Sequence, residues 1–410
     1  MLKCHQQPLC CVVRHTVFGM AACPARLIQM PKFYEFFAGG GMARAGLGRN
    51  WDCLFANDID VTKGASYKAN WGADHLKIAD VAALTSADLP GQADLAWASF
   101  PCQDLSLAGD YAGLNGKRSG TFWRFWRLVE ILSEEKRAPS LIVLENVCGA
   151  ITSHGGSDFA AIAGALHRGG YLFGALVIDA ARFVPQSRPR LFVVAARRDL
   201  PTAAQLVDAV PGNCWYPRSL LTTCDSLPPA TKESWLWWRL PEPPPRTTRF
   251  SDMIEAEPGG VRWHTTAETQ KLIGMMSPAN RGKLDRAIRM GTRVVGGIYR
   301  RTRVDDKGRR VQRAEVRFDD MSGCLRTPAG GSSRQTIMIV EGDRVRSRLL
   351  SPREAARLMG LPEGYLLPEN YNDAYCLAGD GVVVPVVRFL AKHLLEPLVG
   401  SVEDTAREAA

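Results

Sequence analysis

Between Lys32 and Arg197, apolar segments of strand length alternate with helical or loop segments, and this alternation constrains the fold more than any other feature. The expected strands are Phe33–Phe37, Cys53–Ala56, Leu76–Ile78, Leu95–Phe100, Leu141–Leu144, Leu172–Ile178 and Leu191–Ala195. Such a pattern predicts an α/β fold with a mostly parallel, twisted sheet covered by helices on both faces. In sheets of this kind, ligands bind beyond the carboxyl ends of the strands.

The chain changes character after Arg198, where prolines interrupt any long element and tryptophans cluster at Trp235, Trp237 and Trp238. We expect a smaller, irregular domain over residues 198–325. The segment 326–410 is expected to return to the domain formed by residues 32–197, and residues 1–31 to be an N-terminal extension. Helices are predicted at Pro352–Met359, after the capping residue Ser351, and from about Val382 to Leu398.

Composition narrows the class of protein. A chain of 410 residues with 46% hydrophobic residues can bury a sizeable core. We expect no membrane span, because no run of eighteen or more uncharged apolar residues occurs. The 11 cysteines lack disulfide or zinc-ribbon spacing, which favours the reducing cytoplasm and predicts no metal.

The first thirty residues contain a cysteine group: Cys4, Cys10, Cys11 and Cys23. A metal site there is the less favoured reading, and a dispensable extension before an alternative start at Met20 or Met30 is preferred. We reject a secretory leader, because Arg14 and His15 interrupt its apolar run.

The net charge of +9 is concentrated in one stretch. From Arg281 to Arg317 the chain has thirteen lysines and arginines against four acidic residues, so the remainder is close to neutral. Two interpretations stay open: a solvated charged face, or a surface that meets phosphate groups.

Glycines follow the first expected strand in Phe37-Ala38-Gly39-Gly40-Gly41-Met42, where the backbone can approach a ligand closely. The second strand leads to Asp58, whose carboxylate could hold ribose hydroxyls, and the third leads to Asp80. Together these features favour a nucleoside-containing ligand, although a glycine-rich turn alone is weak evidence.

Three more motifs lie at strand ends. The first is Pro101-Cys102-Gln103-Asp104-Leu105-Ser106, which places a cysteine where ligands bind, although most lone cysteines are inert. The second is Glu145-Asn146-Val147 at the end of an apolar strand. In the third, Gln186-Ser187-Arg188-Pro189-Arg190, the two arginines alternate with other residues and so share one side of a strand.

The order and spacing of these motifs resemble the DNA (cytosine-5) methyltransferase family, of the prokaryotic or phage type found in restriction-modification systems. Later motifs agree: Arg326-Thr327-Pro328, Leu350-Ser351-Pro352-Arg353-Glu354 and Gly379-Asp380-Gly381-Val382. The resemblance covers about Lys32–Ala195 and Arg326–Leu398 and implies a Rossmann-like methyltransferase fold. The region between would be the target recognition domain.

The resemblance implies that S-adenosylmethionine is the cofactor. Its expected contacts are Phe37, Gly39, Gly41, Asp58, Ile59, Asp80, Val81, Pro101 and Asp380. Two departures from the family pattern stand out. Asp380 replaces the usual asparagine near the cofactor's methionine end, and Met42 stands where many members have glycine.

The resemblance also implies the catalytic roles. Cys102 would add to C6 of cytosine, Glu145 would donate a hydrogen bond or proton at N3, and Arg190, with Arg188 beside it, would stabilise the charge developing at O2. The target base must be flipped out of the duplex. Expected DNA contacts are Gln103, Ser106, Arg300, Arg301, Arg303, Ser332 and Arg334.

Three other functions compete with this interpretation: a transfer-RNA cytosine-5 methyltransferase of the same fold, a catalytically inactive DNA-binding protein, and a nicotinamide-dependent oxidoreductase. The long basic region before Cys324 favours DNA over RNA, the intact Cys102 and Glu145 disfavour the inactive protein, and the missing Gly-x-Gly-x-x-Gly signature disfavours the oxidoreductase. We expect a cytoplasmic, nucleoid-associated monomer that acts on double-stranded DNA, with a cognate restriction endonuclease that forms no stable complex with it.

Overall fold

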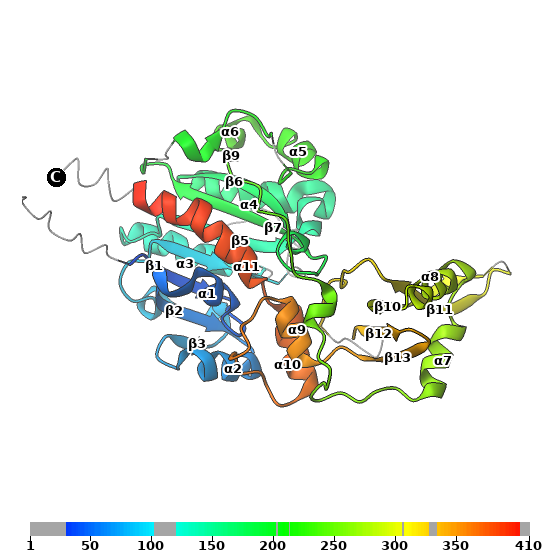
Figure 1. The fold of residues 1–410 in the computed structure, drawn as a ribbon. Helices are drawn as coiled ribbons and strands as arrows, with labels where there is room; N and C mark the ends of the chain where they lie inside the picture. Colours follow the sequence, from blue (N-terminus) through cyan, green and yellow to red (C-terminus); the bar gives the residue numbers. More distant parts are fainter. Residues whose placement is uncertain are drawn as a thin grey trace, which may run out of the picture. The chain divides into compact units, whose positions relative to one another are not determined.

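A seven-stranded sheet with helices on both faces forms the larger part of the computed structural model, which describes residues 30–101, 120–201, 204–212, 214–305, 307–327 and 334–401 (Figure 1). Its strands are β1 (Lys32–Phe36), β2 (Asp52–Asp58), β3 (Leu76–Ile78), β4 (Leu95–Ala98), β5 (Leu141–Val147), β6 (Tyr171–Asp179) and β7 (Pro189–Arg197). All seven predicted strands are confirmed, with ends shifted by at most three residues.

The strand order is β3-β2-β1-β4-β5-β7-β6, and only β7 runs against the others. Because β7 is reversed, its first residues lie at the edge where β5 ends, and Arg190 pairs with Val147. The sheet therefore brings the ends of β1, β2, β4 and β5 and the start of β7 to a single edge, as expected for a Rossmann-like methyltransferase fold.

The helices around this sheet are short and mostly half-buried. They are α1 (Met42–Leu47), α2 (Val61–Trp71), α3 (Thr121–Glu134), α4 (Ser157–Arg168), α5 (Arg218–Asp225), α6 (Pro229–Lys232), α9 (Pro352–Leu358), α10 (Tyr371–Asp380) and α11 (Val384–Leu390), which continues into a π-helical turn at Ala391–Leu395. In α3, residues Phe122, Phe125 and Val129 recur at helical spacing and are buried, so this face packs on the sheet.

A second sheet of four antiparallel strands is more regular than the proline-rich composition predicted. Its order is β11-β10-β12-β13. The strands are β10 (Arg293–Val304), β11 (Arg310–Arg317), β12 (Thr336–Glu341) and β13 (Arg344–Leu349), and helices α7 (Thr266–Gly274) and α8 (Pro278–Arg289) pack on them. A separate apolar core, which includes Leu284, Ile298 and Met338, holds these elements together.

The predicted segment 198–325 does not coincide with the two cores. Trp215 and Trp238 are fully buried in the core of the large sheet, and Trp238 belongs to the short strand β9 (Trp237–Trp238), which pairs with β8 (Val207–Asp208). Conversely, β12 and β13 lie beyond residue 325 but belong to the small sheet. Residues 204–250 thus pack with the large sheet. Residues 336–349 pair within the small sheet, but β12 contributes Ile337 and Ile339 to the core of the large sheet.

The predicted start of α9 is confirmed, and it borders the small sheet. The Ser351 hydroxyl accepts a hydrogen bond from the Glu354 N–H at 3.2 Å, and Glu354 accepts one from the Ser351 N–H at 2.7 Å. Both carboxylate oxygens of Glu354 also accept from Arg348 on β13, at 2.6 and 2.7 Å, and both side chains are fully buried. This ion pair fixes the junction between the small sheet and the C-terminal helices.

The C-terminal helical run from Tyr371 to Ser401 is the one described helix long and apolar enough to cross a membrane. Length and composition are weak evidence for a span, and 61% of its most apolar window is buried inside the protein. Its apolar side chains pack on α1, where Val387 lies against Gly46, which is typical of a core helix.

Candidate active site at the carboxyl edge of the large sheet

The glycine-rich turn between β1 and α1 leaves its backbone open on one side and clamped on the other. Phe37, Gly39 and Gly41 all have positive φ, and a side chain added at Gly39 would meet nothing within 4 Å. The carbonyl of Gly40 accepts hydrogen bonds from the Tyr365 hydroxyl at 2.7 Å and the Trp71 indole at 3.0 Å. The turn is thus held rigidly while free space remains beside Gly39.

Asp58 joins this turn to the end of β2. Its carboxylate accepts from the Gly39 N–H at 2.7 Å and from the Asp60 N–H at 2.8 Å, and the residue is buried. The neighbouring Ile59 is 65% exposed, which is unusual for a large aliphatic side chain. Two residues after the end of β3, Asp80 is exposed and caps a 3-10 turn that begins with the buried Val81.

Asn146 anchors the backbone that leads to Cys102. Its side-chain amide donates to the Phe100 carbonyl at 3.0 Å, one residue before the exposed Pro101. Its amide oxygen accepts from the Val147 N–H at 2.8 Å. The end of β5 therefore determines where the chain leaves β4.

Glu145 and Arg190 form a pair beside this segment. The Arg190 Nε lies 3.4 Å from Glu145 Oε1, and both side chains are largely buried. Burial raises the pKa of Glu145, while the charges of Arg190 and Arg188 and a hydrogen bond from Ser99 hold it lower. A carboxyl group in this setting can stay protonated at a higher pH than usual and so can donate a proton.

Arg188 has a different environment from Arg190. Its guanidinium is buried and donates to three main-chain carbonyls: Leu325 at 2.9 Å, Gly379 at 2.7 Å and Gly381 at 2.8 Å. Burial lowers the pKa of Arg188 to about 10. These bonds leave Arg188 facing the C-terminal segment rather than the Glu145 side chain.

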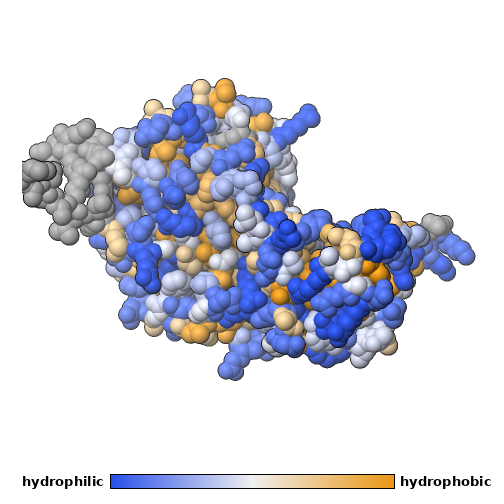
Figure 2. Space-filling view, viewed as in Figure 1, coloured by the Kyte–Doolittle hydropathy of each residue, from blue (hydrophilic) through white to orange (hydrophobic). Residues whose placement is uncertain are grey.

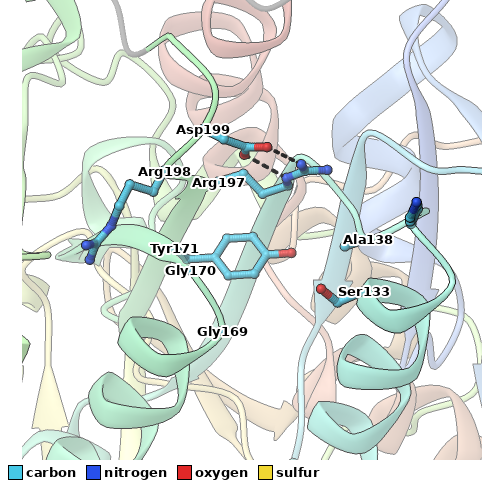
Figure 3. A pocket seen from close by; sticks show the side chains of 9 residues that line it. Ser133, Ala138, Gly169, Gly170, Tyr171, Arg197, Arg198 and Asp199 are labelled. Carbon is cyan, nitrogen blue, oxygen red and sulfur yellow. Dashed lines mark hydrogen bonds and ion pairs between the residues drawn. The ribbon is translucent and has the colours of Figure 1, made fainter.

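A cavity of about 740 Å³ lies away from this edge, among residues such as Lys136, Gly170 and Tyr171. It lies at the start of β6 and the end of the reversed β7, opposite the carboxyl edge. Figure 3 shows Arg197 joined to Asp199 within it, while Arg198 extends to the other side. Since ligands of such sheets bind at the carboxyl ends of the strands, this cavity is not the candidate active site.

The sequence pattern of the family described as C-5 cytosine-specific DNA methylase matches residues 31–396. The chain belongs to this family. Its members are DNA-cytosine methyltransferases by name, and the carboxyl-edge residues described above lie within the matched region.

Two curated relatives and one solved structure are similar to this chain over most of its length. The type II methyltransferase M.HpaII of Haemophilus parainfluenzae is 26% identical over 374 residues, covering 89% of each chain. The type II methyltransferase M.HhaI of Haemophilus parahaemolyticus is 22% identical over 88% of this chain and 94% of its own. Among solved structures, the Dnmt2 methyltransferase of S. pombe has the same fold, with a TM-score of 0.56, 18% identity and coverage of 90% and 99%.

In this cytosine methylase, the predicted DNA-contacting arginines of β10 are all exposed: Arg300, Arg301 and Arg303, called here the β10 arginines. Because side chains alternate along a strand, Arg301 and Arg303 share one face and Arg300 lies on the other. The carboxylate of Glu315 on β11 lies 3.4 Å from the Nε of Arg301 and accepts a hydrogen bond from the Nε of Arg303 at 2.7 Å, so it offsets part of their charge. The small-sheet region is mostly hydrophilic on the face seen in Figure 2. Arg334 is directed elsewhere, since it donates to Asn372 at 2.5 Å and lies over the Tyr371 ring.

Several predicted residues lie outside the described residues: Cys102, Gln103, Ser106 and Ser332. The N-terminal cysteine group also lies outside them. In the described part of the chain, no group of three or more His, Cys, Asp or Glu side chains could hold a metal ion.

Two contributors to the site were not predicted from the sequence. Gln186 donates to the Leu358 carbonyl at 2.8 Å and accepts from the Leu325 N–H at 3.1 Å, which joins three distant segments. Lys63 forms an ion pair with Asp380 at 2.7 Å. Gln186 belongs to a recognised motif, which is a signal that could have found it, whereas nothing in the sequence pairs residues 63 and 380.

Proposed function

We propose that this chain transfers a methyl group from S-adenosylmethionine to C5 of cytosine within a specific sequence of double-stranded DNA. The observation that carries the proposal is the Glu145–Arg190 pair at the end of β5, beside the anchored backbone that leads to Cys102. Family membership gives the cytosine-5 chemistry on DNA. The donor, the duplex and the sequence specificity are the proposed parts.

The residues at the glycine-rich turn fit the proposed cofactor. Open space beside Gly39 admits a ligand against the backbone, and the exposed Ile59 offers an apolar surface for adenine next to the Asp58 carboxylate. Asp58 would hold the ribose, and Asp80 with Val81 would lie at the adenine end. When bound, S-adenosylmethionine supplies an electrophilic methyl group to the activated C5.

Cys102 is the proposed nucleophile. Its thiolate adds to C6 of cytosine, while protonated Glu145 donates its proton to N3, so the ring becomes an enamine that is nucleophilic at C5. Arg190 stabilises the negative charge that develops at O2. After methylation, a water molecule takes the C5 proton, the C6–sulfur bond breaks to release the Cys102 thiolate, and N3 returns its proton to Glu145.

Arg188 is proposed as a positioning residue rather than a catalytic one, because both terminal nitrogens of its guanidinium donate to main-chain carbonyls, three in all. It joins the start of β7 to the segments around Leu325 and Gly379. In this way the strand that carries Arg190 also holds the C-terminal part of the cofactor site.

DNA binding is assigned to the small sheet and its helices, which would form the target recognition unit together with the β10 arginines. Arginines at exposed strand positions can contact phosphates without reading sequence. Glu315 would be displaced or shared when they do so. The target cytosine must leave the base stack to reach Cys102, at a cost of a few kcal/mol.

We further propose that the protein acts as a monomer in the cytoplasm at the nucleoid. The type II relatives support a restriction-modification setting, with an endonuclease that need not form a stable complex with this chain.

Expression in a bacterial host that lacks cytosine methylation, followed by sequencing of recovered DNA for 5-methylcytosine, tests the proposal. We expect methylation confined to one short motif. Cys102→Ser should abolish it while the purified protein still binds cofactor and DNA. Cys214→Ser replaces an exposed thiol and is the matched control, which should keep full methylation.

Two outcomes would contradict the proposal. Methylation that persists in the Cys102→Ser variant would show that another group is the nucleophile. Unmodified DNA from well-folded wild-type protein would favour an RNA substrate or an inactive DNA-binding protein, and these are separated by assaying methyl transfer to bulk transfer RNA.

A further inference from the structure

Asp380, which replaces the asparagine of the family pattern, has two partners in this chain. One carboxylate oxygen lies 2.7 Å from the Lys63 ammonium, and the other accepts a hydrogen bond from the Thr327 hydroxyl. The side chains of Lys63 and Asp380 are 21% and 36% exposed, so the pair is only partly solvated. The carboxylate is therefore already engaged within the protein.

Lys63 occupies a position that its own helix disfavours. It lies in the first turn of α2, after the capping residue Asp60, where the positive end of the helix dipole repels a cation. Burial alone would lower the pKa of Lys63, but the charges of Asp380, Asp58 and Asp60 outweigh it and raise the pKa. Lys63 is thus paired with Asp380 and also feels the charge of the proposed ribose ligand Asp58.

The backbone on both sides of Asp380 is pressed against the glycine-rich turn and its neighbours. A Cβ added at Gly381 would lie 2.2 Å from the Met42 sulfur, and one at Gly379 would lie 2.9 Å from the Arg326 carbonyl carbon. Met42 is the second departure from the family pattern, and it is buried against Gly381. Met42 and Asp380, the two departures from the family pattern, therefore lie where the start of α1 meets the end of α10.

From these contacts we propose that Lys63 and Asp380 are a positioning pair for the cofactor site. The pair holds α10 against α2 and directs the Lys63 ammonium to Asp380, which leaves the Asp58 carboxylate available to the ribose. Asp380 acts through Lys63 and is not itself a cofactor ligand. This inference rests on the proposed use of S-adenosylmethionine.

The proposal predicts a particular pattern of coupling. In Asp380→Asn, the Lys63 ammonium loses its charged partner and turns toward the remaining carboxylates, where it competes with the ribose for Asp58. In Lys63→Met, the Asp380 charge is left partly buried without its counter-ion, and the contact between α2 and α10 weakens. The double variant removes both charges together and leaves the asparagine of the family pattern beside a neutral neighbour.

A double-variant cycle on the full-length protein tests this pattern, with dissociation constants for S-adenosylmethionine measured by calorimetry. We expect each single variant to bind about fivefold more weakly, which is about 1 kcal/mol at 1.36 kcal/mol per tenfold change. The double variant should return to within about twofold of wild type, the scale of coupling seen for contacting residues. Lys68→Gln, an exposed lysine on the same helix, is the matched control and should bind normally.

Kinetic constants separate positioning from catalysis. The single variants should raise KM for S-adenosylmethionine about fivefold and leave kcat at saturation within about twofold of wild type. Thermal melting of the unliganded proteins verifies that each variant is folded, and Lys63→Arg with Asp380→Glu is the fallback pair if a neutral variant does not fold.

Additive effects of the two single variants, or single variants that bind as tightly as wild type, would overturn the positioning role and leave the proposed function intact. A wild-type protein that binds no S-adenosylmethionine would instead overturn the proposed function, and the positioning role with it.

Discussion

Replacing Arg188 with leucine would distinguish a positioning role from a catalytic one. Leucine keeps apolar bulk in the buried site but removes the donors to the carbonyls of Leu325, Gly379 and Gly381. These three carbonyls belong to segments that are far from β7 in the sequence. The variant therefore removes the link between the start of β7 and the C-terminal segment, and it leaves the Glu145–Arg190 pair in place.

The expected loss of stability follows from two opposing effects. Each buried carbonyl left without a donor costs about 2 kcal/mol, or about 6 kcal/mol for the three. Burial lowers the pKa of Arg188 to about 10, so the charged form is already disfavoured by about 3 kcal/mol, and a neutral side chain does not carry that cost. The net loss is therefore about 3 kcal/mol.

Thermal melting measures this loss. An unfolding entropy of roughly 2.1 cal/mol/K per residue over 410 residues converts about 3 kcal/mol into a fall in Tm of about 3–4 °C. At a temperature where the variant is folded, kcat should fall less than about tenfold. Arg190→Leu should behave in the opposite way, with Tm nearly unchanged and kcat lower by about a hundredfold, the scale for the loss of a charge-stabilising donor. An Arg188→Leu protein with unchanged Tm and a kcat lower by a hundredfold would refute the reasoning.

Two further predictions concern pH and salt. Because the pKa of Glu145 is raised by burial and held lower by Arg190, and because the protonated form is the active one, kcat falls as pH rises through that pKa. Arg190→Leu should move this alkaline fall to higher pH at a lower plateau rate, and a movement to lower pH in the kcat profile would contradict the assignment. Changing the β10 arginines to glutamine should flatten the dependence of DNA affinity on salt, by about 0.9 in the logarithmic slope for each phosphate that the variant no longer neutralises. Glu315→Gln is the opposite test, because it releases Arg301 and Arg303 and should strengthen DNA binding. Filter-binding titrations over a salt series measure both effects. If neither variant changes the affinity or its salt dependence, the solvated-face interpretation of β10 is the correct one.

The large sheet was predictable because its strands are evident from local sequence. Strands such as Leu141–Val147 are buried along nearly their whole length, so they form continuous apolar runs that end at polar motifs. The small sheet was not predictable in the same way. Half of β10 is exposed and arginine-rich, and its partner β12 follows β11 only after an intervening segment, so neither hydrophobic pattern nor turn residues indicated the pairing.

At the site, the sequence motifs identified the important residues, but they were a poorer guide to the role of each residue. Arg188 and Arg190 share a motif, yet one is buried against carbonyls and the other pairs with Glu145. That difference depends on Gly379 and Gly381, which approach the start of β7 only in the folded chain. Likewise, the partner of Asp380 is 317 residues away, and no local pattern can identify it.

The clamp on the glycine-rich turn also sets an order of events during synthesis. Tyr365 closes onto the Gly40 carbonyl across 325 residues of sequence. At about 5–20 residues per second, a ribosome needs roughly 15–65 s to make the residues between them. During that time the first strand and its turn have emerged without the helices that complete them. The cofactor pocket is thus among the last features of the molecule to become whole, and a nascent chain remains unable to methylate DNA until its C-terminal helices have been made.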